Sequence, residues 1–163
     1  MDIRRIYNYA LQREREGKQF FEQSAARLQH AAAAGAFRRL AGEEQKHIQF
    51  IQSLLDALDE GRSPSIAEDA QLSGQAFFSD RAASEMLDQT VLESMVPDLP
   101  VLRMAYLIER DFVEFYESAA NRAEGDAKAA LEMLARWERG HARFFKQLHD
   151  TAFEAYVEMP WGG

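Results

Sequence analysis

Apolar residues recur every three or four positions along four segments of the chain, at about 3–28, 37–58, 102–120 and 131–148. This spacing gathers the apolar residues of each segment on one face of an α-helix. No segment shows the sustained alternation of apolar and polar residues that is typical of a half-buried strand. The pattern therefore predicts an all-α protein with four amphipathic helices.

Glycine and proline indicate where these helices end. The alanine run 31–34 followed by Gly35 predicts a tight turn between the first two helices. Gly61 and Pro64 end the second helix, and Gly125 ends the third.

Two aspartates are candidate caps for the helices in the second half of the chain. We expect Asp98 to cap the third helix, with Pro100 in its first turn, and Asp126 to cap the fourth. The predicted helices thus cover about 3–33, 36–59, 99–123 and 126–155.

The segment 61–98 has a weaker pattern and contains Pro64 and Pro97, and Pro100 follows it. We expect it to be a long crossover with one short helix around 81–95. Two helical hairpins joined in this way form a four-helix bundle with one crossover. A chain of 163 residues suits a single domain over 1–163.

Charged residues interrupt all four apolar stripes at positions that helical spacing directs inward. The first and third stripes each carry one glutamate, and the second and fourth each carry a Glu-x-x-His pair. These six residues are Glu14, Glu44, His47, Glu109, Glu138 and His141. Four buried carboxylates without partners would cost many kcal/mol. Two divalent cations would balance their charge, and neutral imidazole binds metal, so the pattern predicts a two-metal site.

Two alternatives to a two-metal site remain open. The carboxylates could form buried salt bridges with neighbouring arginines or lysines, although the stripes offer no inward cation nearby. The site could also keep its residues and bind little metal.

The two halves of the chain align with each other, which makes an accidental motif a poor explanation. A shift of 95 positions aligns the Glu-Arg pair at 14–15 with the pair at 109–110. It also aligns Phe21 with Tyr116. A shift of 94 positions aligns Glu44 with Glu138 and His47 with His141. The chain therefore reads as a duplicated helical hairpin, and each half supplies one Glu and one Glu-x-x-His.

Charge and composition exclude several classes of function. A formal net charge of −8 disfavours a nucleic-acid partner. The absence of cysteine excludes thiolate catalysis and cysteine-ligated iron. No apolar run has the length of a signal peptide or a membrane span, so we expect a cytoplasmic protein with no membrane partner.

Around these residues the sequence resembles rubrerythrin-like proteins of the ferritin-like di-iron carboxylate superfamily, over about 3–58 and 101–152. The resemblance implies a ferritin-like bundle that holds two iron ions, with manganese or a mixed pair as the alternative. It implies that Glu44 and Glu138 bridge or chelate the metals. It implies further that Glu14 and Glu109 are terminal ligands, and that His47 and His141 each bind one metal.

The sequence departs from that family at two points. Full-length rubrerythrins usually add a cysteine-ligated rubredoxin domain as electron donor, and this chain has no cysteine. They also carry an extra glutamate, linked to peroxidase behaviour, where this chain has Phe112. We therefore expect a lone di-iron module that depends on an external redox partner.

The expected function is that of a rubrerythrin-like ferroxidase, oxidase or peroxidase, which oxidises Fe(II) with dioxygen or hydrogen peroxide. The alternatives are iron storage or sequestration in a ferritin-like assembly, and a di-iron sensor. We expect a homodimer or larger homo-oligomer. Tyr7, Tyr106 and Tyr116 are expected to pack in the core. Gly17, one turn from Glu14, is expected either to leave room for a small ligand such as oxygen or to allow close packing.

Overall fold

A computed structural model describes residues 2–64, 66 and 96–159 of the chain. The regular structure in these ranges is entirely helical, which confirms the predicted fold class. The elements are α1 (Ile3–Ala25), α2 (Ala31–Glu60), the short 3-10 helix η1 (Val96–Asp98), α6 (Leu99–Ala120) and α7 (Gly125–Glu158). The short helix expected around 81–95 lies outside the described residues.

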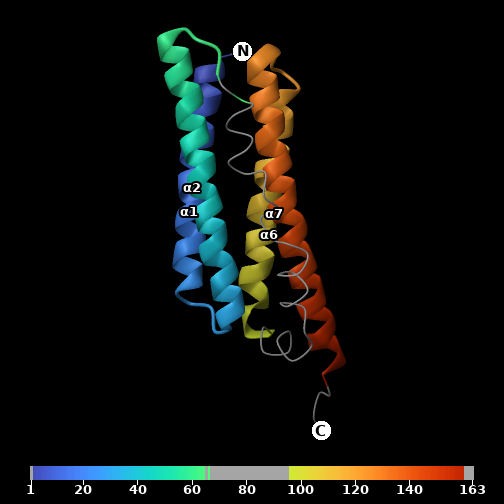
Figure 1. Ribbon diagram of the computed structural model, residues 1–163. Helices are drawn as coiled ribbons and strands as arrows, with labels where there is room; N and C mark the ends of the chain where they lie inside the picture. The colour runs from blue at the N-terminus through green and yellow to red at the C-terminus, as the bar shows by residue number, and fades with distance from the viewer. Residues whose placement is uncertain (1, 65, 67–95, 160–163) are drawn as a thin grey trace.

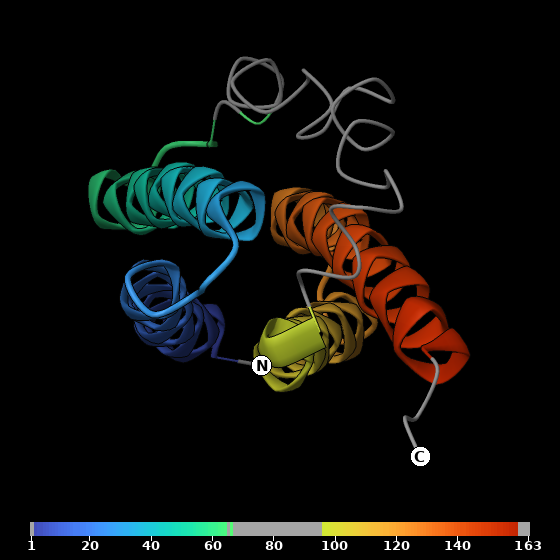
Figure 2. The ribbon, with the colours of Figure 1, turned by 90° about the horizontal axis from the view of Figure 1, so that it is seen from below.

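The four long helices form two antiparallel hairpins, α1 with α2 and α6 with α7 (Figure 1). Seen along the bundle, the four helices occupy the corners of a rough square (Figure 2). None of the described helices is both long enough and apolar enough to cross a membrane.

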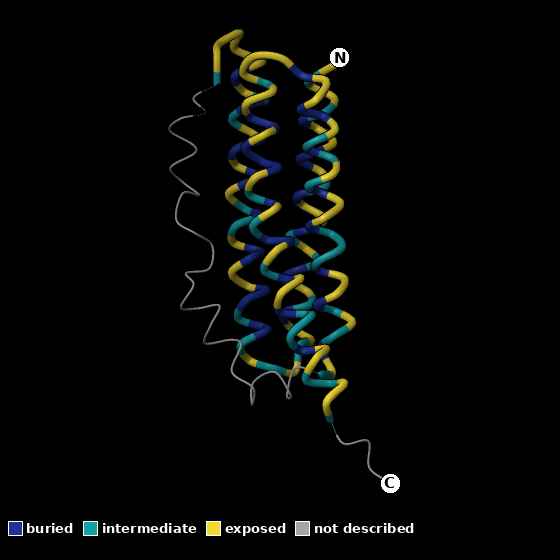
Figure 3. The backbone as a smooth tube through the Cα atoms, turned by 90° about the vertical axis from the view of Figure 1, so that its right-hand side faces the viewer, coloured by how far each residue is buried: buried dark blue, intermediate teal, exposed yellow. Residues whose placement is uncertain are grey.

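Each helix turns one face to the interior, so buried and exposed positions alternate along it (Figure 3). In α1 the buried positions include Tyr7, Ala10, Glu14, Gly17 and Phe21, which are three or four residues apart. This is the spacing that predicted the helix, and it places Glu14 in the middle of the buried face.

Local signals account for two of the helix ends. Asp2 is the N-cap of α1, and its side chain accepts a hydrogen bond from the backbone N–H of Arg5 at 3.2 Å. Gly61 ends α2 in the left-handed conformation, with φ of 65°, and its N–H donates to the carbonyl of Ala57. The predicted end of the second helix is therefore confirmed.

The turn between the first two helices was predicted at the wrong place. The expected helices 3–33 and 36–59 put the turn near Gly35, but α1 ends at Ala25 and Gly35 lies within α2. The alanine run begins α2 instead, because alanine is a strong helix former. The cap is His30, whose Nδ1 accepts from the N–H of Ala32 at 3.2 Å.

One of the two predicted aspartate caps lies at the predicted position, and the other does not. Asp98 occupies the N-cap position of α6, and Pro100 lies in the first turn, both as predicted, but the Asp98 side chain makes no cap hydrogen bond to that helix. Its carboxylate accepts from the N–H groups of Gln29 and His30, at 3.2 and 3.1 Å. Asp126 lies in the first turn of α7, whose N-cap is Glu124.

The core consists of two apolar clusters separated by the six charged residues. One cluster includes Leu54, Tyr116 and Leu134, and the other includes Phe21, Phe37 and Phe145. The ring centroids of these three phenylalanines lie 5.1 to 6.0 Å apart. Tight packing on both sides thus holds the polar layer in register near the middle of the bundle.

Candidate metal centre

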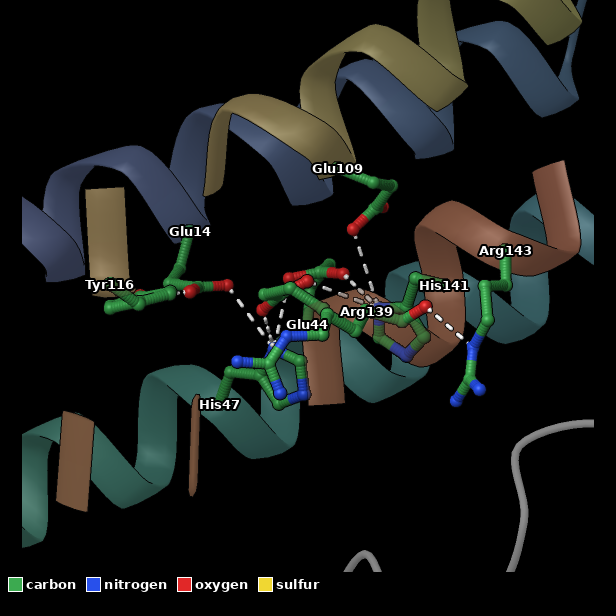
Figure 4. A network of polar contacts seen from close by, with 9 residues as sticks. Glu14, Glu44, His47, Glu109, Tyr116, Arg139, His141 and Arg143 are labelled. Carbon is green, nitrogen blue, oxygen red and sulfur yellow. Dashed lines mark hydrogen bonds and ion pairs between the residues drawn. The ribbon is translucent and has the colours of Figure 1, made fainter. Parts of the chain in front are cut away.

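All four helices contribute to one buried polar cluster at mid-length (Figure 4). α1 supplies Glu14 and α6 supplies Glu109. α2 and α7 each supply a glutamate and, one turn later, a histidine. The four glutamates are fully buried, and the two histidines are 1% and 3% exposed. The structure therefore brings together all six residues that the sequence singled out.

The cluster contains two overlapping groups of four residues, and each group could hold a metal ion. The first group is Glu14, Glu44, His47 and Glu138, and the second is Glu44, Glu109, Glu138 and His141. Within each group the potential ligand atoms lie within 4.8 Å of one another. Glu44 and Glu138 belong to both groups, so their carboxylates lie between the two positions.

The contacts of the shared carboxylates support this division. Glu138 places Oε1 2.8 Å from Nδ1 of His47 and Oε2 3.2 Å from Nδ1 of His141. Glu44 contacts the same two nitrogens. Its Oε2 lies 3.3 Å from Nδ1 of His47, and its Oε1 lies 3.4 Å from Nδ1 of His141. Each shared carboxylate thus turns one oxygen toward each histidine, as a bridging ligand would.

The two outer carboxylates each contact one histidine. Glu14 Oε2 lies 3.4 Å from Nδ1 of His47, and Glu109 Oε2 lies 3.5 Å from Nδ1 of His141. The matching distances in the two halves reflect the duplication in the sequence.

Many polar atoms of the cluster have no hydrogen-bond partner. Among the described residues these atoms are Glu14 Oε2, both oxygens of Glu44 and Glu109, His47 Nδ1 and Glu138 Oε1. Buried polar atoms are normally satisfied, so this concentration needs an explanation. In the described part of the chain, the ion-pair contacts of these carboxylates are to the two histidines. A set of carboxylate oxygens and imidazole nitrogens aimed at one small space fits a pair of divalent metal ions.

Electrostatics divides the carboxylates into two types. Burial, together with the charges of Glu138 and Glu44, raises the pKa of Glu14 and Glu109 well above the usual value. Burial acts on Glu44 and Glu138 as well, but the charge of His47 lowers the pKa of both.

The surroundings of the two histidines shift the pKa of each imidazole upward. Burial alone would lower the pKa of His47 and His141, but the surrounding carboxylates raise both well above the usual value. These shifts favour the protonated forms of Glu14, Glu109 and both histidines, and the ionised forms of Glu44 and Glu138.

Tyr116 of α6 was expected to pack in the core, and it also contacts the polar cluster. Its buried hydroxyl donates a hydrogen bond to Oε1 of Glu14, across the bundle. Burial raises the pKa of Tyr116 well above the usual value, so the hydroxyl stays protonated as a donor. This hydrogen bond orients Glu14, as the outer partners of metal ligands do.

Trp137 was missed by sequence reasoning. Its indole ring stacks on the imidazole of His47, with centroids 5.0 Å apart and planes 16° apart. His47 in turn stacks on His141 at 5.3 Å. The position of Trp137 directly before Glu138 was a visible signal, but its contact with α2 depends on how the hairpins pack.

The space beside Gly17 is filled by Phe112. A Cβ atom at Gly17 would lie 3.0 Å from the Phe112 ring, so the glycine allows this close packing. The guanidinium of Arg13 lies over the same ring, 5.4 Å from its centroid. Gly17 therefore serves close packing, one of the two expected roles.

Comparison with known proteins gives one finding. The family model described as Rubrerythrin matches residues 6–149. Neither the curated proteins nor the solved structures gave a match. The matched range contains all six residues of the polar cluster.

Proposed function

Because the chain belongs to the rubrerythrin family, we propose that it is an oxidoreductase with two iron ions at the buried polar cluster. In this proposal Glu14, Glu44, Glu138 and His47 bind one ion, and Glu44, Glu109, Glu138 and His141 bind the other. The protein would oxidise Fe(II) with dioxygen or hydrogen peroxide, and an external donor would return the electrons.

The observation that carries this proposal is the sharing of two carboxylates between two groups of ligands. Glu44 and Glu138 each direct one oxygen toward each histidine. A single metal ion would not need a second, symmetric set of buried donors. Two ions a few ångströms apart use such shared carboxylates as bridges.

Ligand chemistry supports iron for the pair. Four carboxylates and two imidazoles are hard and intermediate donors, which suit iron or manganese better than metals that prefer sulfur. When bound, a ferrous pair supplies two electrons to dioxygen or peroxide. We choose iron over manganese because of family membership.

The protein side chains have separate tasks in this proposal. Metal binds the deprotonated form of each ligand, so the two histidines and the outer glutamates, whose pKa values are raised, would release protons when metal binds. Tyr116 holds Glu14 in the orientation that turns its free oxygen toward His47. The rings of Trp137 and Phe112 pack against His47 and Gly17 and limit access of water.

Anaerobic loading with ferrous iron followed by oxygen tests the proposal. We expect about two irons per chain, from the two ligand groups, and a ferric charge-transfer band after oxidation. Glu44→Ala combined with Glu138→Ala should abolish tight binding, because both positions lose their shared ligands. The matched control is Glu22→Ala with Glu132→Ala, two exposed helical glutamates, which should bind iron normally.

Two results would contradict the proposal. One is tight iron binding that survives the Glu44→Ala, Glu138→Ala substitution. The other is a hollow assembly, seen by light scattering, that takes up many more than two irons per chain, since this would favour storage.

A further inference from the structure

A basic groove lies along the exposed side of α6 and α7. It has a volume of about 410 Å³, and Tyr106, Val113 and Ala142 contribute to its lining. Five cationic side chains complete the lining: Arg110, Arg136, Arg139, Arg143 and Lys146. This concentration of positive charge occurs on a chain with a net charge of −8.

Four of the cations form a continuous stripe on α7. Positions 136, 139, 143 and 146 are three or four residues apart, so they share one face of the helix. Like charges at this spacing repel one another and lower the stability of the helix. The stripe therefore costs stability unless a counter-charge binds to it.

Acidic neighbours neutralise only part of this charge. Glu114 Oε1 lies 3.3 Å from Nε of Arg110, and Glu117 Oε1 lies 2.6 Å from Nη2 of Arg139. Asp150 pairs with Lys146. The Arg143 Nε donates to the backbone carbonyl of Arg139, which carries no charge. Three acidic partners for five cations leave the basic groove with an excess of positive charge among the described residues.

The duplicated half of the chain provides an internal comparison. The groove between α1 and α2 has a similar volume, about 400 Å³. Its lining holds two cations, Arg15 and Lys18, and Lys18 pairs with Glu22 at 3.1 Å. The shift of 94 positions matches the four α7 cations with Gly42, Gln45, Gln49 and Gln52. The hairpin of α1 and α2 thus forms the same fold and supplies the equivalent half of the polar cluster without these four cations. Neither the fold nor the cluster requires them.

The basic groove lies directly behind two residues of the candidate metal centre. Arg139 follows Glu138 in the chain, and Ala142 follows His141. Figure 4 shows Arg143 on the same helix as His141, pointing away from the carboxylates. A ligand in the groove would therefore be separated from the polar cluster by the backbone of α7.

We propose that the basic groove binds a phosphorylated aromatic redox carrier of mononucleotide size, a reduced flavin mononucleotide, and is the entry point for electrons. This inference rests on the proposed function. Arginine forks bind phosphate with paired, charge-assisted hydrogen bonds. Tyr106 and Val113 offer aromatic and apolar contact for a ring, and the volume is that of a small-molecule site.

The electron count agrees with this assignment. A reduced flavin ring releases two electrons and two protons on oxidation. Two ferric ions take up two electrons in returning to the ferrous state. An acidic redox protein would meet repulsion from the rest of this negatively charged surface, whereas a mononucleotide contacts the groove alone.

Fluorescence titration of flavin mononucleotide with the metal-free full chain tests the binding. We expect saturable binding that weakens with added salt, and binding of riboflavin that is about tenfold weaker or less, because it lacks the phosphate. Arg139→Gln with Arg143→Gln, which restores the glutamines of α2, should weaken binding of flavin mononucleotide by about tenfold or more. Arg15→Gln with Lys18→Gln, in the groove between α1 and α2, is the matched control and should leave binding unchanged.

Several results would overturn the proposal: no saturable binding, equal binding of riboflavin, equal binding of inorganic phosphate, or equal losses in the two double variants. Because the titration needs no metal, it stays informative even if iron loading fails. In iron-loaded protein, reduction by reduced flavin mononucleotide should slow in the Arg139→Gln, Arg143→Gln variant. An unchanged rate would overturn the role in electron entry.

Discussion

At the scale of single residues, Tyr116 makes the two halves of the candidate metal centre inequivalent. Its hydroxyl donates to Glu14, whereas Phe21, its counterpart in the first half, has no hydroxyl to offer Glu109. Both Glu109 oxygens lack a hydrogen bond, while Glu14 has one oxygen held and one turned toward His47. The Glu14 carboxylate is therefore held in one orientation by a hydrogen bond, and the Glu109 carboxylate is not.

We predict that Tyr116→Phe weakens metal binding on the Glu14 side by about 10- to 100-fold, the usual effect of removing an outer partner of a ligand. Anaerobic titration against a competing chelator measures the two binding steps. Tyr7→Phe, at a buried tyrosine outside the cluster, is the control and should bind like the parent. Equal losses in both variants would assign the effect to packing.

At the scale of helices, Asp98 links the start of α6 to the turn before α2. Its buried carboxylate accepts two backbone N–H groups, those of Gln29 and His30, and His30 then caps α2. The contact spans 68 positions in sequence, so no local pattern indicated it. It holds the turn at 26–30 against the start of α6.

Asp98→Ala should therefore lower the free energy of unfolding by about 2–3 kcal/mol, because two backbone donors lose a charged acceptor. Urea unfolding followed by circular dichroism measures this change. Asp111→Ala, at an exposed position of α6, should change stability by less than about 0.5 kcal/mol. A loss no larger than that of Asp111→Ala would show that the turn is stable without Asp98.

At the scale of the whole molecule, the metal-free cluster links stability to pH. Folding raises the pKa of Glu14 and Glu109 above 4.5 and of both histidines above 6.5. The folded state thus holds protons that the unfolded chain releases, and stability falls as pH rises above these ordinary values. Each proton that the folded state binds in excess of the unfolded chain lowers the free energy of unfolding by about 1.4 kcal/mol per unit rise in pH. Glu44 and Glu138, whose pKa values are lowered, have the opposite effect, but only below about pH 4.5.

We predict that the melting temperature of the metal-free protein drops by about 5 °C or more between pH 6 and pH 8. Saturating ferrous iron should raise it and flatten its pH dependence, since metal replaces the protons. Differential scanning calorimetry measures both effects. Glu14→Gln with Glu109→Gln should reduce the slope because the amides do not titrate. A slope that this variant leaves unchanged would contradict the assignment of protons to the outer carboxylates.

Sequence reasoning found the parts of this protein that depend on local helix geometry. A period of 3.6 residues decides which side chains share a face, so the apolar stripes indicated four helices and the interruptions indicated Glu14, Glu44, His47, Glu109, Glu138 and His141. The duplication of the hairpin then related Glu14 to Glu109. These features need only the spacing of residues within one helix and the alignment of one half of the chain with the other.

Contacts between helices were decided by the tertiary structure alone. The hydrogen bond from Tyr116 to Glu14, the stacking of Trp137 on His47 and the reach of Asp98 to the α1–α2 turn each join different helices or hairpins. The convergence of α6 and α7 side chains in the basic groove is of the same kind. Such contacts depend on the rotation and axial offset of each helix. Packing of the whole core sets these two quantities, and the sequence of a single segment does not encode them.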